Sequence, residues 1–387
     1  MRRYAKILRA PGVARVLFSQ LTARFPFGML SIAFLVFAER TYNSYAVAGA
    51  VLGAMSLGNA VAGPISSRLL GVWGIRQVVM GTILICSATL TVMAFAPMPS
   101  WVMMALGVIA GATYPPVQSA VRTIYPTMVE DTQINALYSL DAAAQEIIWI
   151  IGPVMTTFVS IQINAVLGIM LAVAFFIFGG LWFITSPAVA SVQLPRSNSR
   201  FGAVLRRPLV SLNTVIGLLL VASFAAAEAG IIAVFGDGNS QSGFVLGIWA
   251  FGSLIGGLAL GHRRTRPFST AQYVALSLAG LALALFSTDF WWLAATLLLS
   301  GIGVAPTLAT LFATVTSSVD FSETPEAFGW LGTGQLIGAA SGAAVAGIAI
   351  DHFGAHAALI VSALFMVLTL ATAFVAVPWM PKKITGD

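Results

Sequence analysis

Charged residues are scarce in this sequence, since Asp, Glu, Lys and Arg together make up 8% of its 387 residues. Ordinary soluble domains carry about 25% of these residue types. So few charges exclude a water-soluble globular class for a chain of this length. The hydrophobic fraction of 58% and the mean hydropathy of +0.93 indicate an integral membrane protein instead.

Cysteine and histidine are almost absent. The single cysteine, Cys86, excludes a disulfide within one chain. His352 and His356 lie four residues apart beside Asp351, but the intervening Gly354 disfavours a helix there, and we predict no metal site. The sequence has no GxxxxGK[ST] phosphate loop and no nucleophile with its base. We therefore expect neither an enzyme nor an ATP-driven motor, and no cofactor.

What is abundant is apolar sequence in runs of about 20 residues, the length that crosses a hydrocarbon core as a helix. These runs recur along the whole chain and leave no soluble domain between them. The sequence predicts an all-α polytopic membrane protein with twelve transmembrane helices. The expected spans are 13–38, 45–70, 77–96, 100–125, 133–160, 164–186, 209–235, 241–261, 268–287, 291–318, 325–350 and 356–378.

The formal net charge of +6 does not indicate a nucleic-acid partner, because the basic residues sort by loop. Of the nineteen Lys and Arg residues, all but Arg24 and Arg40 fall on one side of the membrane if the N-terminus is cytoplasmic. Positive residues concentrate in cytoplasmic loops. We therefore expect a plasma-membrane protein with both termini in the cytoplasm, and we expect it to be a monomer.

A polar, basic, proline-containing segment at 187–208 divides the chain into two halves, 1–186 and 209–387. Shifting the sequence by roughly half its length superimposes glycines of the two halves, which indicates an internal repeat. Six spans are an even number, so the repeats are predicted to be parallel in the membrane. The matched pairs are Gly49 and Gly243, Gly53 and Gly247, Gly58 and Gly252, Gly63 and Gly257, and Gly107 and Gly301.

This organisation resembles the major facilitator superfamily of secondary transporters over essentially the full chain. The loop "GPISSRLLGVWGIRQ" between spans two and three is similar to that family's loop motif, but Gly71 stands where the family has an aspartate. In the family this loop helps to latch the cytoplasmic side. The resemblance, with the equivalent loop "GHRRTR", implies a cytoplasmic gate formed by Arg68, Gly71, Arg76, Arg263 and Arg264.

The pair Gly152 and Pro153 resembles the core of the family's antiporter motif, as in small bacterial drug and metabolite exporters. The resemblance favours export over uptake.

Four ionisable residues within the predicted spans are candidates for a functional role: Arg24, Asp141, Glu146 and Glu228. Ionisable side chains inside a membrane are costly and usually serve a function. Asp141 and Glu146 are five residues apart and point about 140° away from each other around a helix, so they cannot form one carboxylate pair.

Each of the four has alternative interpretations. Asp141 either assists proton transfer or, if its helix begins at Ala142, is an N-cap. Glu146 either carries the coupling proton, as a carboxyl group in an apolar cavity can, or pairs with Arg24. Glu228 is a second proton carrier or an outer gate residue. Arg24 keeps its proton and is interpreted as an anchor for an anionic or polar substrate group.

Aromatic and amide side chains within spans are candidates to line a central cavity. Simple interhelical packing is the alternative for each of them. We also expect Arg122, near the inner end of its span, to extend toward the membrane interface. The candidate lining residues are Tyr114, Gln118, Trp149, Trp249, Trp330 and Gln335.

The function expected from these features is proton-coupled export of a small, partly apolar or amphipathic compound. Its partners would be that substrate, protons and the lipid bilayer. Proton-coupled uptake of a polar metabolite, with Arg24 as anchor, is the alternative. Lipid flipping and a non-transporting membrane scaffold are further alternatives.

The first testable prediction concerns topology. Green fluorescent protein fused after residue 198, in the linker, should fluoresce, because that protein matures only in the cytoplasm. Fused after residue 98, between the third and fourth expected spans, it should be dark, whereas alkaline phosphatase should be active there. The opposite pattern at residue 198 would overturn the topology and the repeat.

Overall fold

The computed structural model describes residues 2–236, 240–261, 263 and 265–380. Within these ranges every regular element is a helix. Eleven helical segments are long and apolar enough to cross a membrane, and the shorter apolar helix α13 (Ser269–Ala284) occupies the place of the remaining predicted span. The predicted all-α polytopic membrane fold is confirmed.

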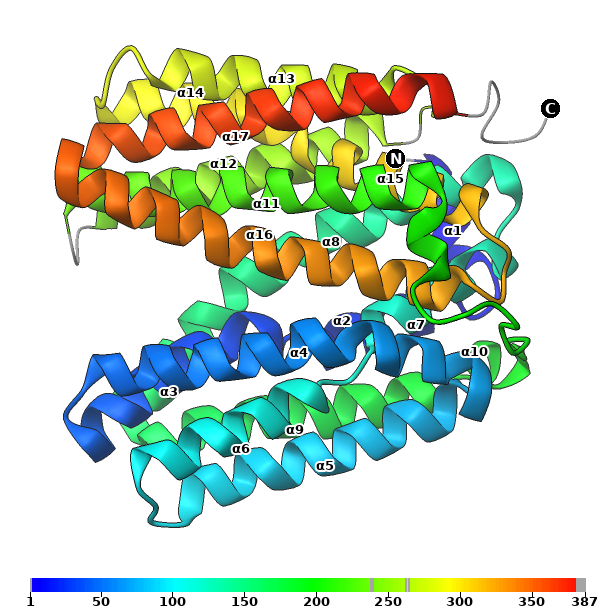
Figure 1. Cartoon of the computed structure of the whole chain (residues 1–387), viewed down its shortest axis with the longest axis horizontal. Coiled ribbons are helices and arrows are strands. Elements are labelled where there is room, and N and C mark those ends of the chain that lie inside the picture. The colour runs from blue at the N-terminus through cyan, green and yellow to red at the C-terminus, as the bar shows by residue number, and fades with distance from the viewer. Residues whose placement is uncertain (1, 237–239, 262, 264, 381–387) are drawn as a thin grey trace.

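The helices before the linker, apart from α1 and α8, form the lower bundle in Figure 1, and those after the linker form the upper one; α1 and α8 lie between the bundles. The elements before the linker are α1 (Arg2–Arg9), α2 (Val13–Arg24), α3 (Pro26–Tyr42), α4 (Tyr45–Trp73), α5 (Ile75–Phe95), α6 (Ser100–Ala112), α7 (Val117–Ile124), η1 (Tyr125–Thr127), α8 (Asp131–Phe158), η2 (Val159–Ile163) and α9 (Ala165–Ile184). The linker contains α10 (Pro187–Ser191) and η3 (Ala203–Arg206). The upper set is α11 (Pro208–Phe235), α12 (Ser240–Leu260), α13, α14 (Phe290–Ile302), α15 (Val304–Ser318), α16 (Thr324–Phe353), α17 (Ala355–Ala376) and η4 (Val377–Trp379).

Three predicted spans are each built from two helices. The first breaks at Phe25 because Pro26, the first residue of α3, cannot continue the hydrogen-bond ladder of α2. The fourth breaks at Pro115 and Pro116 between α6 and α7, and the tenth breaks at Gly303. The first break places Arg24 in the last turn of α2, and Arg122 lies in the last turn of the short helix α7, which ends at Ile124.

Glycines bring helices of each half into close contact. A Cβ atom at Gly58 or Gly111 would overlap backbone atoms of the facing helix, Val108 and Met55 respectively. In the second half, Gly252 lies in the same way against the backbone of Leu298. These positions are consistent with the packing role of small residues between membrane helices.

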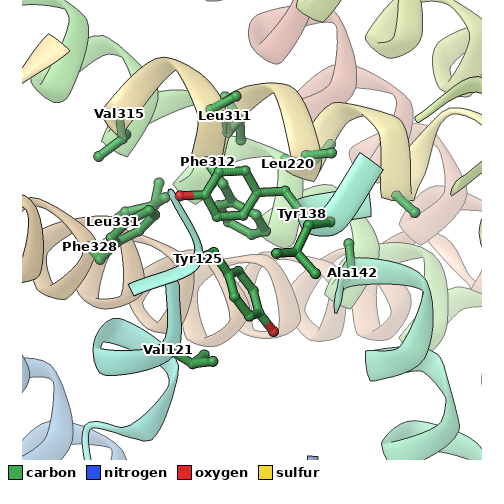
Figure 2. Close-up of a cluster of buried hydrophobic side chains, with 14 of the residues drawn as sticks. Val121, Tyr125, Tyr138, Ala142, Leu220, Leu311, Phe312, Val315, Phe328 and Leu331 are labelled. Atoms are coloured by element: carbon green, nitrogen blue, oxygen red, sulfur yellow. The ribbon is translucent and has the colours of Figure 1, made fainter. Parts of the chain in front are cut away.

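The two halves touch near the end of the bundle that carries α1 and α10, which we call the α1 end (Figure 1). There the aromatic ring of Tyr138 on α8 packs edge-on against Phe312 of α15, with ring centroids 6.0 Å apart. Tyr138 also donates to or accepts from Thr316 at 2.7 Å. Figure 2 shows Tyr125, Tyr138, Phe312 and Phe328 packed together there, and we call this aromatic cluster the seal. The apolar core is therefore continuous across the halves at this end.

Contacts between the halves stop partway along the helices. Among the described residues, the hydrogen bonds between α4 and α16 run from Arg68 to Glu326 and from Thr333 to the Ala60 carbonyl. Farther from the α1 end, a Cβ atom at Gly53 would meet nothing within 4 Å. The structure is thus closed at the α1 end, and the helices diverge away from it (Figure 1).

The glycine packing leads to a second prediction. Gly111→Ala should destabilise the protein because its methyl group would overlap the Met55 backbone, which cannot rotate away. Overpacking of this kind costs about 1–3 kcal/mol, and thermal unfolding in detergent measures it. Gly53→Ala is the matched control and should unfold like the wild type. Equal stability of the two variants would contradict this account of helix packing.

Candidate functional site

The carboxylate of Asp141 is the centre of a polar network buried inside the first half. Asp141 has no exposed surface, and α8 begins ten residues earlier, so the N-cap alternative is wrong. Its Oδ1 accepts hydrogen bonds from Gln20 Nε2 at 2.9 Å and from Tyr125 Oη at 3.2 Å. The carboxylate thus joins α2, η1 and α8.

Two arginines bind the same carboxylate. Arg24 Nη1 lies 3.2 Å from Asp141 Oδ1, and Arg122 Nε lies 3.2 Å from Asp141 Oδ2. The proposed alternative pairing of Arg24 with Glu146 is not found; Arg24 pairs with Asp141. The sequence prediction that Arg122 reaches the membrane interface is wrong, because only 2% of its surface is exposed.

Arg122 is held on its other face by an aromatic ring from the second half. Its guanidinium carbon lies 3.5 Å from the centroid of Phe312, which is a cation–π contact. The ion pair with Asp141 and the contact with this ring offset the free-energy cost of removing the Arg122 charge from water.

Three glutamine side chains complete the network. Gln20 Oε1 accepts from Arg24 at 2.8 Å. Gln145 Oε1 accepts from Arg24 Nη2 and lies 3.4 Å from Arg122 Nη2. The amide oxygen of Gln118, when turned toward Arg122, accepts from its Nη2 at 3.2 Å. The structure therefore brings together three of the site residues predicted from the sequence, Arg24, Gln118 and Asp141. Gln145 lies beside them.

Glu146 faces away from this network, as its position on the helix requires. Its Oε1 accepts a hydrogen bond of 2.8 Å from Ser253 Oγ on α12. The bond crosses from the first half to the second, near the middle of α8. Beyond it, the apolar side chains of Ile150 and Val154 on α8 are exposed. Glu146 thus lies where the contact between the halves ends.

The aromatic candidates of the first half form a chain of edge-on contacts. Phe27 lies 5.3 Å from Trp149 and 6.2 Å from Tyr114, measured between ring centroids. Trp149 is 46% exposed. These aromatic rings form an apolar surface, and the buried Tyr114 hydroxyl beside it has no hydrogen-bond partner among the described residues.

The remaining lining candidates do not join this cluster. Trp249 packs against Phe224, with ring centroids 5.4 Å apart, and Gln335 lies beside Gly217. Trp330 donates to Glu326 at 3.4 Å, at the α1 end. Glu228 on α11 is exposed and shows no hydrogen bond or ion pair within the described residues.

At the predicted gate, the ion pair runs from Arg68 to Glu326 of α16, with 2.9 Å between Nη1 and Oε2. Arg68 also donates to the carbonyl of Ser199 in the linker, and Glu326 accepts from the Gly202 amide at 2.7 Å. Sequence reasoning missed Glu326, although it lies one residue inside a predicted span.

The other gate candidates make different contacts. Arg76 donates to the Ile184 carbonyl at 2.8 Å within the first half, and a Cβ atom at Gly71 would lie 3.2 Å from the Pro195 carbonyl oxygen. The Arg263 carbonyl accepts from Asn135 at 3.3 Å, which links the halves. Arg264 lies outside the described residues.

Network members that the sequence did not single out include Gln20 and Tyr125. Gln20 precedes Arg24 by one helical turn, a spacing that places both on one face, so a signal was available. Tyr125 gave no comparable signal, because its contact depends on the break between α6 and α7. No cluster of three or more His, Cys, Asp or Glu side chains in the described part of the chain could hold a metal ion.

Comparison with known proteins identifies the architecture. The family model of the Major Facilitator Superfamily matches residues 16–270 and, in a second match, residues 223–385. No curated protein sequence matches the chain. Among solved structures, the human organic anion transporter MFSD10 is similar with a TM-score of 0.71 at 15% identity, covering 94% of this chain and 100% of that one.

A bacterial homologue of the iron transporter ferroportin, in an outward-facing state, is similar with a TM-score of 0.77 at 12% identity. The alignment covers 94% of this chain and 98% of that one. The same homologue with soaked iron gives a TM-score of 0.73 at 14% identity, with the same coverage. At these identities the likeness shows the fold alone.

The third prediction tests the buried carboxylate. Asp141→Asn removes the one negative charge that Arg24 and Arg122 share, leaving both guanidinium groups without an anion. Breaking a buried pair in this way costs about 3–5 kcal/mol, so the free energy of unfolding in mixed micelles should fall by that order. Asp351→Asn, an exposed position at the end of α16, is the control. A wild-type free energy of unfolding for Asp141→Asn would contradict the conclusion that this carboxylate holds the network together.

Proposed function

The chain belongs to the Major Facilitator Superfamily and is a secondary transporter, and from that premise we propose that it exports a small, partly apolar or amphipathic compound in exchange for protons. The two six-helix halves, residues 1–186 and 209–387 joined by the 187–208 linker, would rock about a central site. The α1 end would face the cytoplasm, and the conformation described here would be outward-facing.

The observation that carries this proposal is the position of Glu146. It is a membrane carboxyl group whose hydrogen bond to Ser253 links the two halves at the limit of their contact. When the halves separate at the α1 end, we expect that bond to break and the surroundings of the carboxyl group to change. A group whose environment differs between two conformations can couple its proton occupancy to their populations.

Asp141 has a supporting role in this proposal. In the conformation described here it is bound to two arginines, so it would assist proton transfer only after the network rearranges. Glu228, exposed on α11, would act as a second carrier or at the outer mouth. The export direction is supported by the Gly152 and Pro153 pair and by the aromatic chain of Phe27, Tyr114 and Trp149.

Uptake of a polar metabolite is the competing proposal, favoured by the buried position of Arg24 in a hydrogen-bonded network. The structurally similar transporters are named for different cargo, organic anions and iron, so the fold does not choose between cargoes. Direction is decided by which sign of imposed pH gradient accumulates the cargo in vesicles.

The fourth prediction tests the proton carrier. Cells with and without the protein are first screened for growth on a broad compound panel, and a compound that discriminates them is followed in vesicles with an imposed pH gradient. Glu146→Gln keeps the side-chain shape and mimics the protonated form, so gradient-driven transport should be lost while expression is retained. We expect at least a tenfold fall in rate, about 1.4 kcal/mol or more in barrier.

Glu130→Gln is the matched control, because Glu130 is the exposed residue preceding the first turn of the same helix. It should transport like the wild type. If Glu146→Gln transports at the wild-type rate with unchanged pH dependence, the assignment is wrong. Glu228 or Asp141 then becomes the candidate, and the same assay on Glu228→Gln separates the two, because Asp141→Asn is expected to unfold more readily.

A further inference from the structure

We propose that Arg24, Arg122 and Gln145 form the binding site for an anionic group, and that the cargo is accordingly a small organic monoanion with an apolar body. This inference rests on the proposed transport function and names the substrate class for it. It is carried by the charge balance of the buried network, by the contacts of one glutamine and by the aromatic side chains next to it.

The charge balance leaves one positive charge without a partner. Arg24 and Arg122 both bind the single carboxylate of Asp141. Guanidinium groups keep their proton in proteins. The other side chains that contact them, Gln20, Gln145, the reoriented Gln118 and the Phe312 ring, carry no formal charge. Two cations therefore share one anion in a buried setting, where an unpaired charge is costly.

Gln145 occupies the place where a second anion would complete the balance. Its Oε1 accepts from the Nη2 atoms of both arginines. Two guanidinium groups converging on one oxygen is an arrangement that carboxylate oxygens satisfy better than a neutral amide. Asp141 is fully buried, whereas Gln145 is only partly buried. Gln145 is therefore the contact that an arriving anion can displace.

An apolar surface adjoins this position on the same helix face. Trp149 lies four residues after Gln145, one turn farther from the α1 end, and packs edge-on against Phe27. Both rings are partly exposed, at 46% and 39%. The buried Tyr114 hydroxyl, on the other side of Phe27, is a hydrogen-bond donor without a partner among the described residues. An anionic head on the arginines would thus place an apolar body against these rings.

The helix ends near the site do not remove the unbalanced charge. Arg24 lies in the last turn of α2 and Arg122 in the last turn of α7, where the helix dipole favours a cation. These dipoles are fixed parts of the fold and help to retain the arginines when the site is empty. A mobile anion supplies what they lack, which is a full negative charge at the Gln145 position.

The experiment compares three probes of one size that differ in charge. Benzoate, benzamide and benzylammonium are added at equal concentration and constant ionic strength, and the thermal unfolding midpoint of the detergent-solubilised full chain is recorded. A ligand that binds the folded state raises that midpoint. For the wild type, benzoate should raise it by about 2 °C or more beyond benzamide, and benzylammonium should not exceed benzamide.

Gln145→Glu is the decisive variant, because it builds the missing carboxylate into the site with the shape of the glutamine. Without any probe it should unfold at a higher temperature than the wild type, and the extra effect of benzoate over benzamide should disappear. Gln162→Glu, at an exposed position in η2, adds the same charge to the protein away from the arginines. It should keep the wild-type response to benzoate.

The proposal is overturned if benzoate and benzamide act alike on the wild type, if Gln145→Glu retains the benzoate effect, or if Gln145→Glu is less stable than the wild type. None of these readouts requires transport or a proton gradient. A failure here would therefore leave the Glu146 test of proton coupling standing. A failure of the Glu146 test would leave anion binding standing.

Discussion

The carboxylate of Asp141 is the group on which the polar interior of the first half depends. Four side chains from three helical segments donate hydrogen bonds to it: Gln20, Arg24, Arg122 and Tyr125. Each donor is buried, and none has another anion within reach in the described residues. Without that carboxylate the ends of α2 and α7 would present bare guanidinium groups to an apolar interior.

The same network connects the interior of one half to the closure between the halves. Arg122 binds Asp141 through Nε while its guanidinium plane lies over Phe312 of α15. Next to it, the Tyr138 hydroxyl donates to the Arg122 carbonyl at 2.8 Å and shares a second hydrogen bond with the Thr316 hydroxyl. Arg122 therefore connects the Asp141 network directly to the seal at the α1 end.

The sequence was sufficient for the membrane class, the span positions and the family, because apolar length, loop charge and glycine spacing are local properties. It was not sufficient for Arg122. A basic residue near a span end normally reaches water. In the structure Arg122 lies on a separate short helix, α7, after the break at Pro115 and Pro116, and its side chain is buried against Asp141 and Phe312. The pairing of Arg68 with Glu326 joins residues 258 positions apart, and no pattern within either segment indicates its partner. Contacts of this kind follow from how the halves dock.

The linker between the halves has a consequence for the balance of conformations. Its Ser199 carbonyl accepts a hydrogen bond from Arg68, and its Gly202 amide donates one to Glu326. The linker therefore takes part in holding the α1 end closed. Hydrogen bonds to charged groups contribute about 1.5–3 kcal/mol each, and every 1.4 kcal/mol changes a population ratio about tenfold. The backbone around residues 199–202 would then help to set the fraction of molecules that are closed at the α1 end. Small changes in its length or stiffness would reset how often the protein opens toward the α1 end, without altering any residue that touches cargo or proton.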